Sequence, residues 1–309
     1  MISIIICSKD KHMLSQLESN ISETIGVPYE IISINNSNGF YGICEAYNLG
    51  GGLAKYKFLC FVHEDVLFRT KNWGVNIINH FTHDTRLGLI GIAGSKIKTK
   101  SLSSWWQSNI DDYQPNRENI IQHYKQTERD TEHFLLNPYN EILSEVVTLD
   151  GVFLVTKRNI WQYSKFDEHL LKGFHCYDLD FSLQITKYYK IAVVFDILIE
   201  HFSEGSINRS FYDDLIGVHK KFRNYLPLNK LLPNNKNFYF HDITTMIEGY
   251  GIARKISVPL RTLFFYDIFN ISYYFFPIHQ LKYFILFIIQ KAMNKILTVK
   301  HMLLFRKKS

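Results

Sequence analysis

The chain has 309 residues, of which 46% are hydrophobic and 21% are charged. This composition excludes intrinsic disorder and low-complexity fibres, and the length suits one large domain, or one domain with an appendage. The four cysteines form no CxxC pair, which excludes a zinc ribbon and a disulfide scaffold and favours a reducing compartment. The apolar N-terminus has no basic region or cleavage site, so we expect a first strand rather than a signal peptide.

The net charge of +6 is unevenly distributed along the chain. Residues 254–309 contain ten Lys or Arg and one acidic residue, whereas residues 1–253 contain 25 basic and 28 acidic side chains. A nucleic-acid-binding domain would carry the basic excess itself, so this distribution argues against a nucleic-acid partner. We expect the two regions to face different surroundings.

Strands and helices alternate along the first 225 residues. Apolar runs and helical spacing predict strands over 2–7, 29–34, 58–62, 87–93, 145–155 and 191–199, and helices over 11–25, 43–55, 173–188 and 211–225. Between them, we expect 99–140 to be an excursion of loops and short helices. The alternation favours an α/β fold with a mostly parallel sheet and flanking helices.

Three polar loops follow the first three predicted strands, at 8–10, 35–39 and 63–65. In parallel sheets, ligands bind outside the carboxyl ends of the strands. The sequence therefore predicts a ligand site where these three loops meet.

The tripeptide His63-Glu64-Asp65 follows an apolar strand. A carboxylate at this place can reach the ligand crevice, where a hard divalent cation would bridge it to substrate phosphates. Acidic residues also follow strands simply because turns are polar, so this motif alone leaves both interpretations open.

Residues 173–181 form a second acidic cluster, with Asp178 in the predicted first turn of a helix. The backbone N–H groups and the helix dipole favour a carboxylate there, and it can act as a general base if it faces a bound hydroxyl. Alternatively, Asp178 or Asp180 is only an N-cap. His201, just past a predicted strand, is either a ligand of a metal or diphosphate, or a structural histidine.

Several familiar motifs are missing from the sequence. No GxGxxG follows the first strand, and neither GxxxxGK[ST] nor GxSxG occurs. The sequence therefore disfavours dinucleotide-binding, P-loop and α/β-hydrolase proteins.

Seven segments follow one another in a fixed order over residues 1–225: Ala46-Tyr47-Asn48-Leu49-Gly50, Phe61-Val62-His63-Glu64-Asp65-Val66, Ile90-Gly91-Ile92-Ala93-Gly94, Leu149-Asp150-Gly151, Phe166-Asp167-Glu168, residues 173–181, and His201-Phe202-Ser203-Glu204-Gly205. This ordered set resembles the family 2 glycosyltransferases with the GT-A fold, in a bacterial glycosyltransferase-like branch.

The resemblance implies an inverting glycosyltransferase with a nucleotide-sugar donor and a divalent metal, Mn²⁺ or Mg²⁺. It makes Asp65 the metal ligand, His201 a second ligand to the metal or the diphosphate, and Asp178 the catalytic base. The positions that it matches to donor contacts are Ser8, Asp10, Asn35, Asn36, Asn48 and His63.

Three positions depart from the family pattern. His63 replaces the first acid of Asp-x-Asp, Asn35-Asn36 stands where many relatives have paired Asp, and Tyr177 replaces the Glu before the base. Two alternatives therefore stay open: a catalytically inactive GT-A-like binding or scaffold protein, and a nucleotidyltransferase.

The expected organisation is a catalytic domain over 1–226, a linker over 227–253, and a helical tail over 254–309. The uncharged run 268–281 is shorter than the ~20 apolar residues that span a bilayer. The basic, aromatic and amphipathic tail suits the surface of an anionic membrane, or packing on the domain or on a second subunit. We expect a cytoplasmic enzyme, peripheral on the inner membrane face, that acts on a glycan or lipid-linked acceptor in bacterial surface polysaccharide synthesis.

Overall fold

The computed structural model describes residues 1–109, 113–125, 128–205 and 207–231, and 241–252 apart from 243, 247 and 250. The chain divides into two compact units, Met1–Leu260 and Arg261–Ser309, and all of the described residues belong to the first. The predicted tail, 254–309, lies outside the described residues. None of the helices in the described part of the chain is long and apolar enough to span a membrane.

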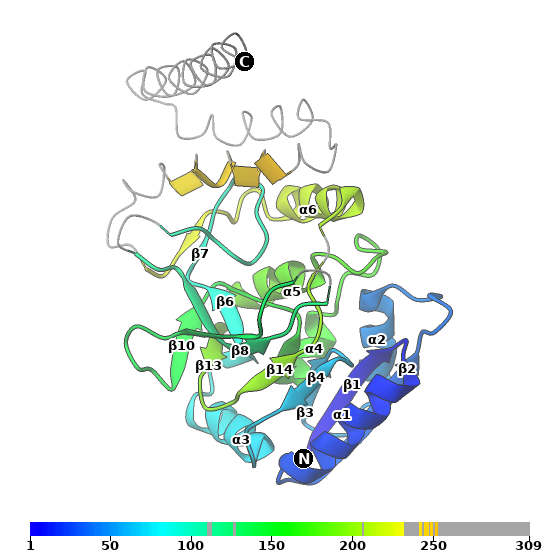
Figure 1. Cartoon of the computed structure of the whole chain (residues 1–309). Coiled ribbons are helices and arrows are strands. Elements are labelled where there is room, and N and C mark those ends of the chain that lie inside the picture. The colour runs from blue at the N-terminus through cyan, green and yellow to red at the C-terminus, as the bar shows by residue number, and fades with distance from the viewer. Residues whose placement is uncertain are drawn as a thin grey trace, which may run out of the picture. The chain divides into compact units, whose positions relative to one another are not determined.

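A seven-stranded sheet forms the centre of the first unit (Figure 1). Its order is β10 (Leu143–Val146), β13 (Lys190–Val194), β5 (Leu87–Gly91), β12 (Phe153–Lys157), β3 (Phe58–Val62), β1 (Ile2–Ser8) and β2 (Tyr29–Asn35). The pairs β1–β2, β1–β3 and β5–β13 are parallel, whereas β12 is antiparallel to both of its neighbours and β10 is antiparallel to β13. The loops after β1, β2 and β3 therefore lie at one edge of the sheet.

A second sheet has the order β11 (Thr148–Leu149), β6 (Ala93–Ser95), β8 (Asn116–Gln122), β14 (Ile199–His201) and β4 (Val66–Phe68). Strand β9 (Glu132–Leu136) pairs with β8, and β15 (Leu228–Asn229), within the predicted linker, pairs with β7 (Ile97–Lys98). In the antiparallel β4–β14 pair, His201 lies opposite Val66. This register brings the end of β14 beside the residues that follow β3.

Helices cover both faces of the central sheet. On one face, Ile2, Ile4 and Ile6 share a core cluster with residues of α1 (Lys11–Thr24) and α3 (Trp73–His83). On the other lie α2 (Ile43–Leu53), α4 (Arg158–Tyr163) and α5 (Tyr177–Thr186), while α6 (Arg209–Lys221) follows β14. Strand β1 is buried on both faces in this layered α/β domain, and the predicted fold class is confirmed.

The glycines inside α2 permit a close approach of neighbouring elements. A methyl group on Gly50 would overlap the side chain of Ile5 in β1, and one on Gly51 would lie 2.6 Å from the ring of Trp161 in α4. The glycine-rich helix is therefore held between the sheet and α4, and it does not form a phosphate-binding loop.

Three predictions of secondary structure were wrong in detail. The single strand predicted over 145–155 is three strands, because the segment turns at Asp150, whose carboxylate accepts the N–H of Val152. The strand predicted over 191–199 is β13 and β14. The excursion over 99–140 contains β8 and β9.

The sequence pattern does not predict strand β8, because most of its buried positions are polar. Asn119 is buried and donates to the carbonyl groups of Phe195 and Ile197, while the buried Asn116 pairs with the backbone of Gln107. Hydrogen bonds satisfy these side chains, so a strand without apolar alternation can pack inside the molecule.

Candidate active site

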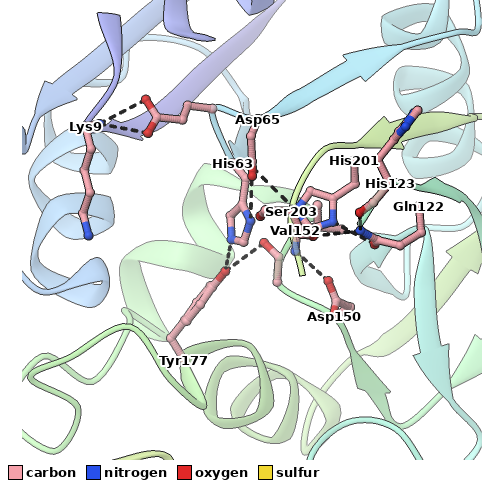
Figure 2. Close-up of polar contacts among 12 residues, drawn as sticks. Lys9, His63, Asp65, Gln122, His123, Asp150, Val152, Tyr177, His201 and Ser203 are labelled. Carbon is pink, nitrogen blue, oxygen red and sulfur yellow. Dashed lines mark hydrogen bonds and ion pairs between the residues drawn. The ribbon is translucent and has the colours of Figure 1, made fainter. Parts of the chain in front are cut away.

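Three side chains with metal-ligating atoms converge at the edge of the central sheet (Figure 2). His63 and Asp65 follow β3, and His201 ends β14. Oδ1 of Asp65 lies 3.6 Å from Nε2 of His201 and 4.0 Å from Nδ1 of His63. The hydrogen bond from the N–H of Phe202 to the carbonyl of Asp65, 3.0 Å long, ties the two segments together. The structure thus brings together three of the predicted site residues.

The electrostatics of this cluster lower the pKa values of both Asp65 and His63. Burial alone would raise the pKa of Asp65, but His201 and His63 together hold it well below its ordinary value. Burial, and then the neighbouring His201, lower the pKa of His63. A neutral His63 keeps a lone pair on one ring nitrogen, which a metal ligand needs.

The donor set fits a divalent cation. The three ligand atoms lie within 4.8 Å of one another. Ligand atoms around a tetrahedral Zn²⁺ lie ~3.4 Å apart, so the widest pair would have to approach by about 1.4 Å to close the shell. Nε2 of His201 is buried and has no hydrogen-bond partner among the described residues. A cation would satisfy this buried nitrogen, which otherwise costs free energy.

Asp178 faces the same cavity as the two histidines. The cavity has a volume of about 470 Å³, and its lining includes His63, Asp150, Asp178 and His201. Burial, and then the nearby charge of Asp150, raise the pKa of Asp178 to about 7. A carboxylate with a pKa near neutrality is suited to act as a general base. The N-cap of α5 is Cys176, at φ 57°, so Asp178 is not the capping residue.

Asp180, the other acid of this cluster, belongs to the scaffold. It is fully buried, and its two oxygens accept hydrogen bonds from Lys221 (2.7 Å) and Gln184 (2.6 Å). It does not line the cavity. Because its hydrogen-bonding capacity is used inside the protein, Asp180 is not free to accept a proton from a substrate.

The first predicted donor loop is fixed by Glu64. The Glu64 carboxylate accepts the backbone N–H groups of Lys9 and Asp10, with each distance 3.0 Å. The Asp10 side chain caps α1 by accepting from the N–H groups of His12 and Met13. The structure therefore places Asp10 beside the site loops with its carboxylate engaged in a helix cap.

The second predicted donor loop is held by its own asparagines. Asn36 is buried, and its side chain both donates to the carbonyl and accepts from the N–H of Tyr41. Asn35 accepts from the N–H of Ser37, and the N–H of Asn36 donates to the carbonyl of Ser8. These residues shape the ends of β1 and β2 next to the cluster.

Asn48 lies apart from the cavity. Its amide in α2 donates to the carbonyl of Phe166 (2.8 Å) and to Glu168 (2.7 Å). Its oxygen accepts the N–H of Phe166. Asn48 thus anchors the segment that precedes α5, and it is not among the residues that line the cavity.

Sequence reasoning did not assign a role to three residues around the cluster: Tyr177, Gln122 and Glu64. Tyr177 stood out only as a departure from the family pattern. Gln122 lies in β8, within the segment predicted as loops, so no local signal pointed to it. Glu64 faces away from the cluster and holds the loop at Lys9, a role that only the tertiary structure reveals.

The family model described as Glycosyltransferase like family matches residues 3–205. No protein with a curated function matches the sequence significantly. The crystal structure of S. aureus TarS 1-349 is 10% identical, with a TM-score of 0.51, and the likeness covers 87% of this chain and 79% of that chain. At this identity the likeness concerns the fold alone.

Two further solved structures have slightly lower TM-scores. The structure of S. aureus TarS 1-349 in complex with UDP-GlcNAc has a TM-score of 0.47 and 11% identity, and the likeness covers 82% of this chain and 74% of that chain. The structure of GalNAc-T7 with UDP, GalNAc and Mn²⁺ has a TM-score of 0.46 and 11% identity, and the likeness covers 72% of this chain and 48% of that chain. This chain thus spans about half the length of GalNAc-T7. The family match covers most of the chain and confirms the resemblance seen in the sequence: the chain belongs to the Glycosyltransferase like family.

Proposed function

We propose that this chain is a metal-dependent, inverting glycosyltransferase that moves a sugar from a nucleotide-sugar donor to an acceptor hydroxyl. One observation carries the proposal: His63 and His201, which form a cation-binding donor set with Asp65, line the same cavity of about 470 Å³ as Asp178. Family membership supplies the reaction class.

The residues of the chain fit separate parts of this reaction. A divalent cation held by His63, Asp65 and His201 would neutralise charge on the diphosphate leaving group. Asp178 accepts the proton of the acceptor hydroxyl, whose oxygen forms the new bond to the anomeric carbon. The bond from that carbon to the diphosphate oxygen breaks, and the nucleoside diphosphate leaves. Attack from the side opposite the leaving group inverts the configuration.

The acceptor that we propose is a glycan or a lipid-linked glycan of a bacterial cell surface. The basic, aromatic tail over 254–309 supports it, because its sequence suits attachment to the inner face of an anionic membrane. A surface-bound enzyme would search for a lipid-linked acceptor in two dimensions.

A product assay tests the proposal. The full chain would be incubated with Mn²⁺ and a panel of nucleotide sugars, and the released nucleotide identified by chromatography. Release of a nucleoside diphosphate is the expected result. Transfer of a nucleoside monophosphate would instead favour a nucleotidyltransferase. Absence of metal-dependent nucleotide binding in calorimetry would favour an inactive GT-A-like binding protein and overturn the proposal.

A further inference from the structure

We propose that Tyr177 and Gln122 are positioning residues that fix the tautomers of His63 and His201, so that two imidazole lone pairs converge with Asp65. The resulting site, with two nitrogen donors and one oxygen donor, selects a transition-metal ion such as Mn²⁺ or Zn²⁺ over Mg²⁺. The inference rests on the proposed metal site, and it assigns roles to two side chains that touch only its ligands.

The first contact determines which ring nitrogen of His63 carries the proton. The hydroxyl oxygen of Tyr177 lies 3.0 Å from the carbonyl oxygen of Gly151 and 2.6 Å from Nε2 of His63 (Figure 2). A carbonyl oxygen can only accept, so the phenol proton points to Gly151. The phenol oxygen must then accept a proton from Nε2 of His63. The lone pair of His63 is left on Nδ1, the nitrogen that faces Asp65.

The second contact determines which ring nitrogen of His201 carries the proton. The amide nitrogen of Gln122 donates to the carbonyl oxygens of His123 (2.6 Å) and Ser203 (2.8 Å). Its oxygen therefore faces Nδ1 of His201, at 3.0 Å, and can only accept. Nδ1 of His201 carries the proton, and the lone pair is left on the buried Nε2, 3.6 Å from Oδ1 of Asp65.

Two of the departures from the family pattern are linked in the structure, because the two side chains contact each other. His63 stands in place of the first acid of Asp-x-Asp, and Tyr177 in place of the acid before the base. A methyl group on Gly151 would overlap the Tyr177 hydroxyl, so glycine is required for this contact. The histidine and the tyrosine that positions it thus act together.

The donor chemistry of the cluster decides which ion it prefers. Mg²⁺ requires oxygen ligands in near-ideal octahedral geometry, whereas imidazole nitrogen suits first-row transition metals. Two imidazole donors with one carboxylate therefore disfavour Mg²⁺. Removing a hydrogen bond that orients a metal-ligating histidine typically lowers metal affinity by about 10–100-fold.

The test starts from the metal-free full chain labelled with ¹⁵N-histidine. The ¹⁵N shifts of the imidazoles, assigned with single histidine variants, should show the Nε2–H tautomer for His63 and the Nδ1–H tautomer for His201. The Tyr177→Phe variant should lose the single tautomer of His63, and Gln122→Met that of His201. The opposite tautomers in the unsubstituted protein would overturn the inference.

Titration calorimetry with MnCl₂, ZnCl₂ or MgCl₂ alone then tests selectivity. We expect Mn²⁺ and Zn²⁺ to bind at least ~10-fold more tightly than Mg²⁺, and Tyr177→Phe to weaken Mn²⁺ binding by ~10-fold or more. Tyr212→Phe is the matched control, because it also removes a hydrogen bond from a phenol to a backbone carbonyl, that of Gly249. It should leave metal affinity unchanged.

The outcomes separate this inference from the proposed function. Equal affinity for Mg²⁺ and Mn²⁺, or unchanged Mn²⁺ affinity in Tyr177→Phe, would overturn the inference while product release from nucleotide sugars could still be observed. Selective metal binding without any release of nucleoside diphosphate would support the inference and contradict the proposed function.

Discussion

The ammonium group of Lys221 lies 2.7 Å from Oδ1 of Asp180 and thereby ties the end of α6 to the first turn of α5. The same ammonium group lies 2.7 Å from Oδ2 of Asp167. Asp180 is fully buried, so Lys221 balances a carboxylate that water does not reach. Asp178, two residues earlier in α5, is thus held in place by a neighbouring ion pair in which it takes no part.

Lys221→Met should destabilise the protein, because it leaves the Asp180 carboxylate buried without its cation. The expected loss is on the order of 3 kcal/mol in the free energy of unfolding, measured by urea denaturation. Lys220→Met, at an exposed position of the same helix, is the control and should change stability by less than ~0.5 kcal/mol. If the two variants are equally stable, the ion pair is not a structural support.

Asp178→Asn should abolish transfer and preserve donor binding. The amide keeps the shape of the side chain but cannot accept the hydroxyl proton, so transfer should fall by at least ~10²-fold in a product assay. In the unsubstituted protein, transfer should increase as the pH rises through about 7, where Asp178 loses its proton. If the variant transfers sugar normally, Asp150, which lines the same cavity, becomes the candidate base.

The same substitution should stabilise the protein at alkaline pH. Burial and Asp150 raise the pKa of Asp178 to about 7 in the folded state, whereas an unfolded chain has a value near ~3.9. At pH values between ~3.9 and about 7, the folded protein holds a proton on Asp178 that the unfolded chain has released, so the stability of the protein falls as the pH rises. With chelator present, Asp178→Asn should therefore have a higher Tm than the unsubstituted protein at pH 8 and a similar Tm at pH 3. A constant difference at both pH values would contradict this account.

Asp65→Ala should abolish metal-dependent nucleotide binding and leave the fold nearly intact. Asp65 supplies the one oxygen donor of the cluster, and its position after a strand suggests little loss of core packing. The check is calorimetry with a nucleoside diphosphate and Mn²⁺, together with a thermal melt. Asp196→Ala is the matched control, because Asp196 also contacts a histidine, His80 at 2.9 Å, outside the cluster. Equal nucleotide affinity in Asp65→Ala and the unsubstituted protein would refute the assignment.

The first three strands and their loops could be predicted because local pattern and tertiary role agree. The run from Ile2 to Cys7 is apolar on both sides because helices cover both faces of β1. The loop from His63 to Asp65 ends a buried strand, where ligand-binding residues are expected. In these segments the sequence near each residue contains the information that determines its structure.

The rest depends on contacts between distant segments. Gln122 orients His201 from a strand whose buried positions are polar, and Tyr177 reaches His63 from a helix 114 residues later in the chain. Neither contact can be recognised from the periodicity or the composition of the sequence. The motifs therefore singled out His63, Asp65 and His201, whereas no sequence pattern pointed to the residues that contact the two histidines.

The final prediction concerns the basic tail, which lies outside the described residues. Its sequence has ten basic residues against one acid, and each Lys or Arg near an anionic bilayer contributes about 1 kcal/mol of attraction. The full chain should sediment with phosphatidylserine-containing liposomes, and less of it as salt rises, because salt screens this attraction. Protein that ends before Arg254 should stay in the supernatant. A full chain in which Lys291 and Lys295 are replaced by Glu should sediment less than the unsubstituted chain. Neutral phosphatidylcholine liposomes are the control. A full chain that ignores anionic liposomes at low salt would instead indicate that the tail packs on the domain or on a second copy of the chain.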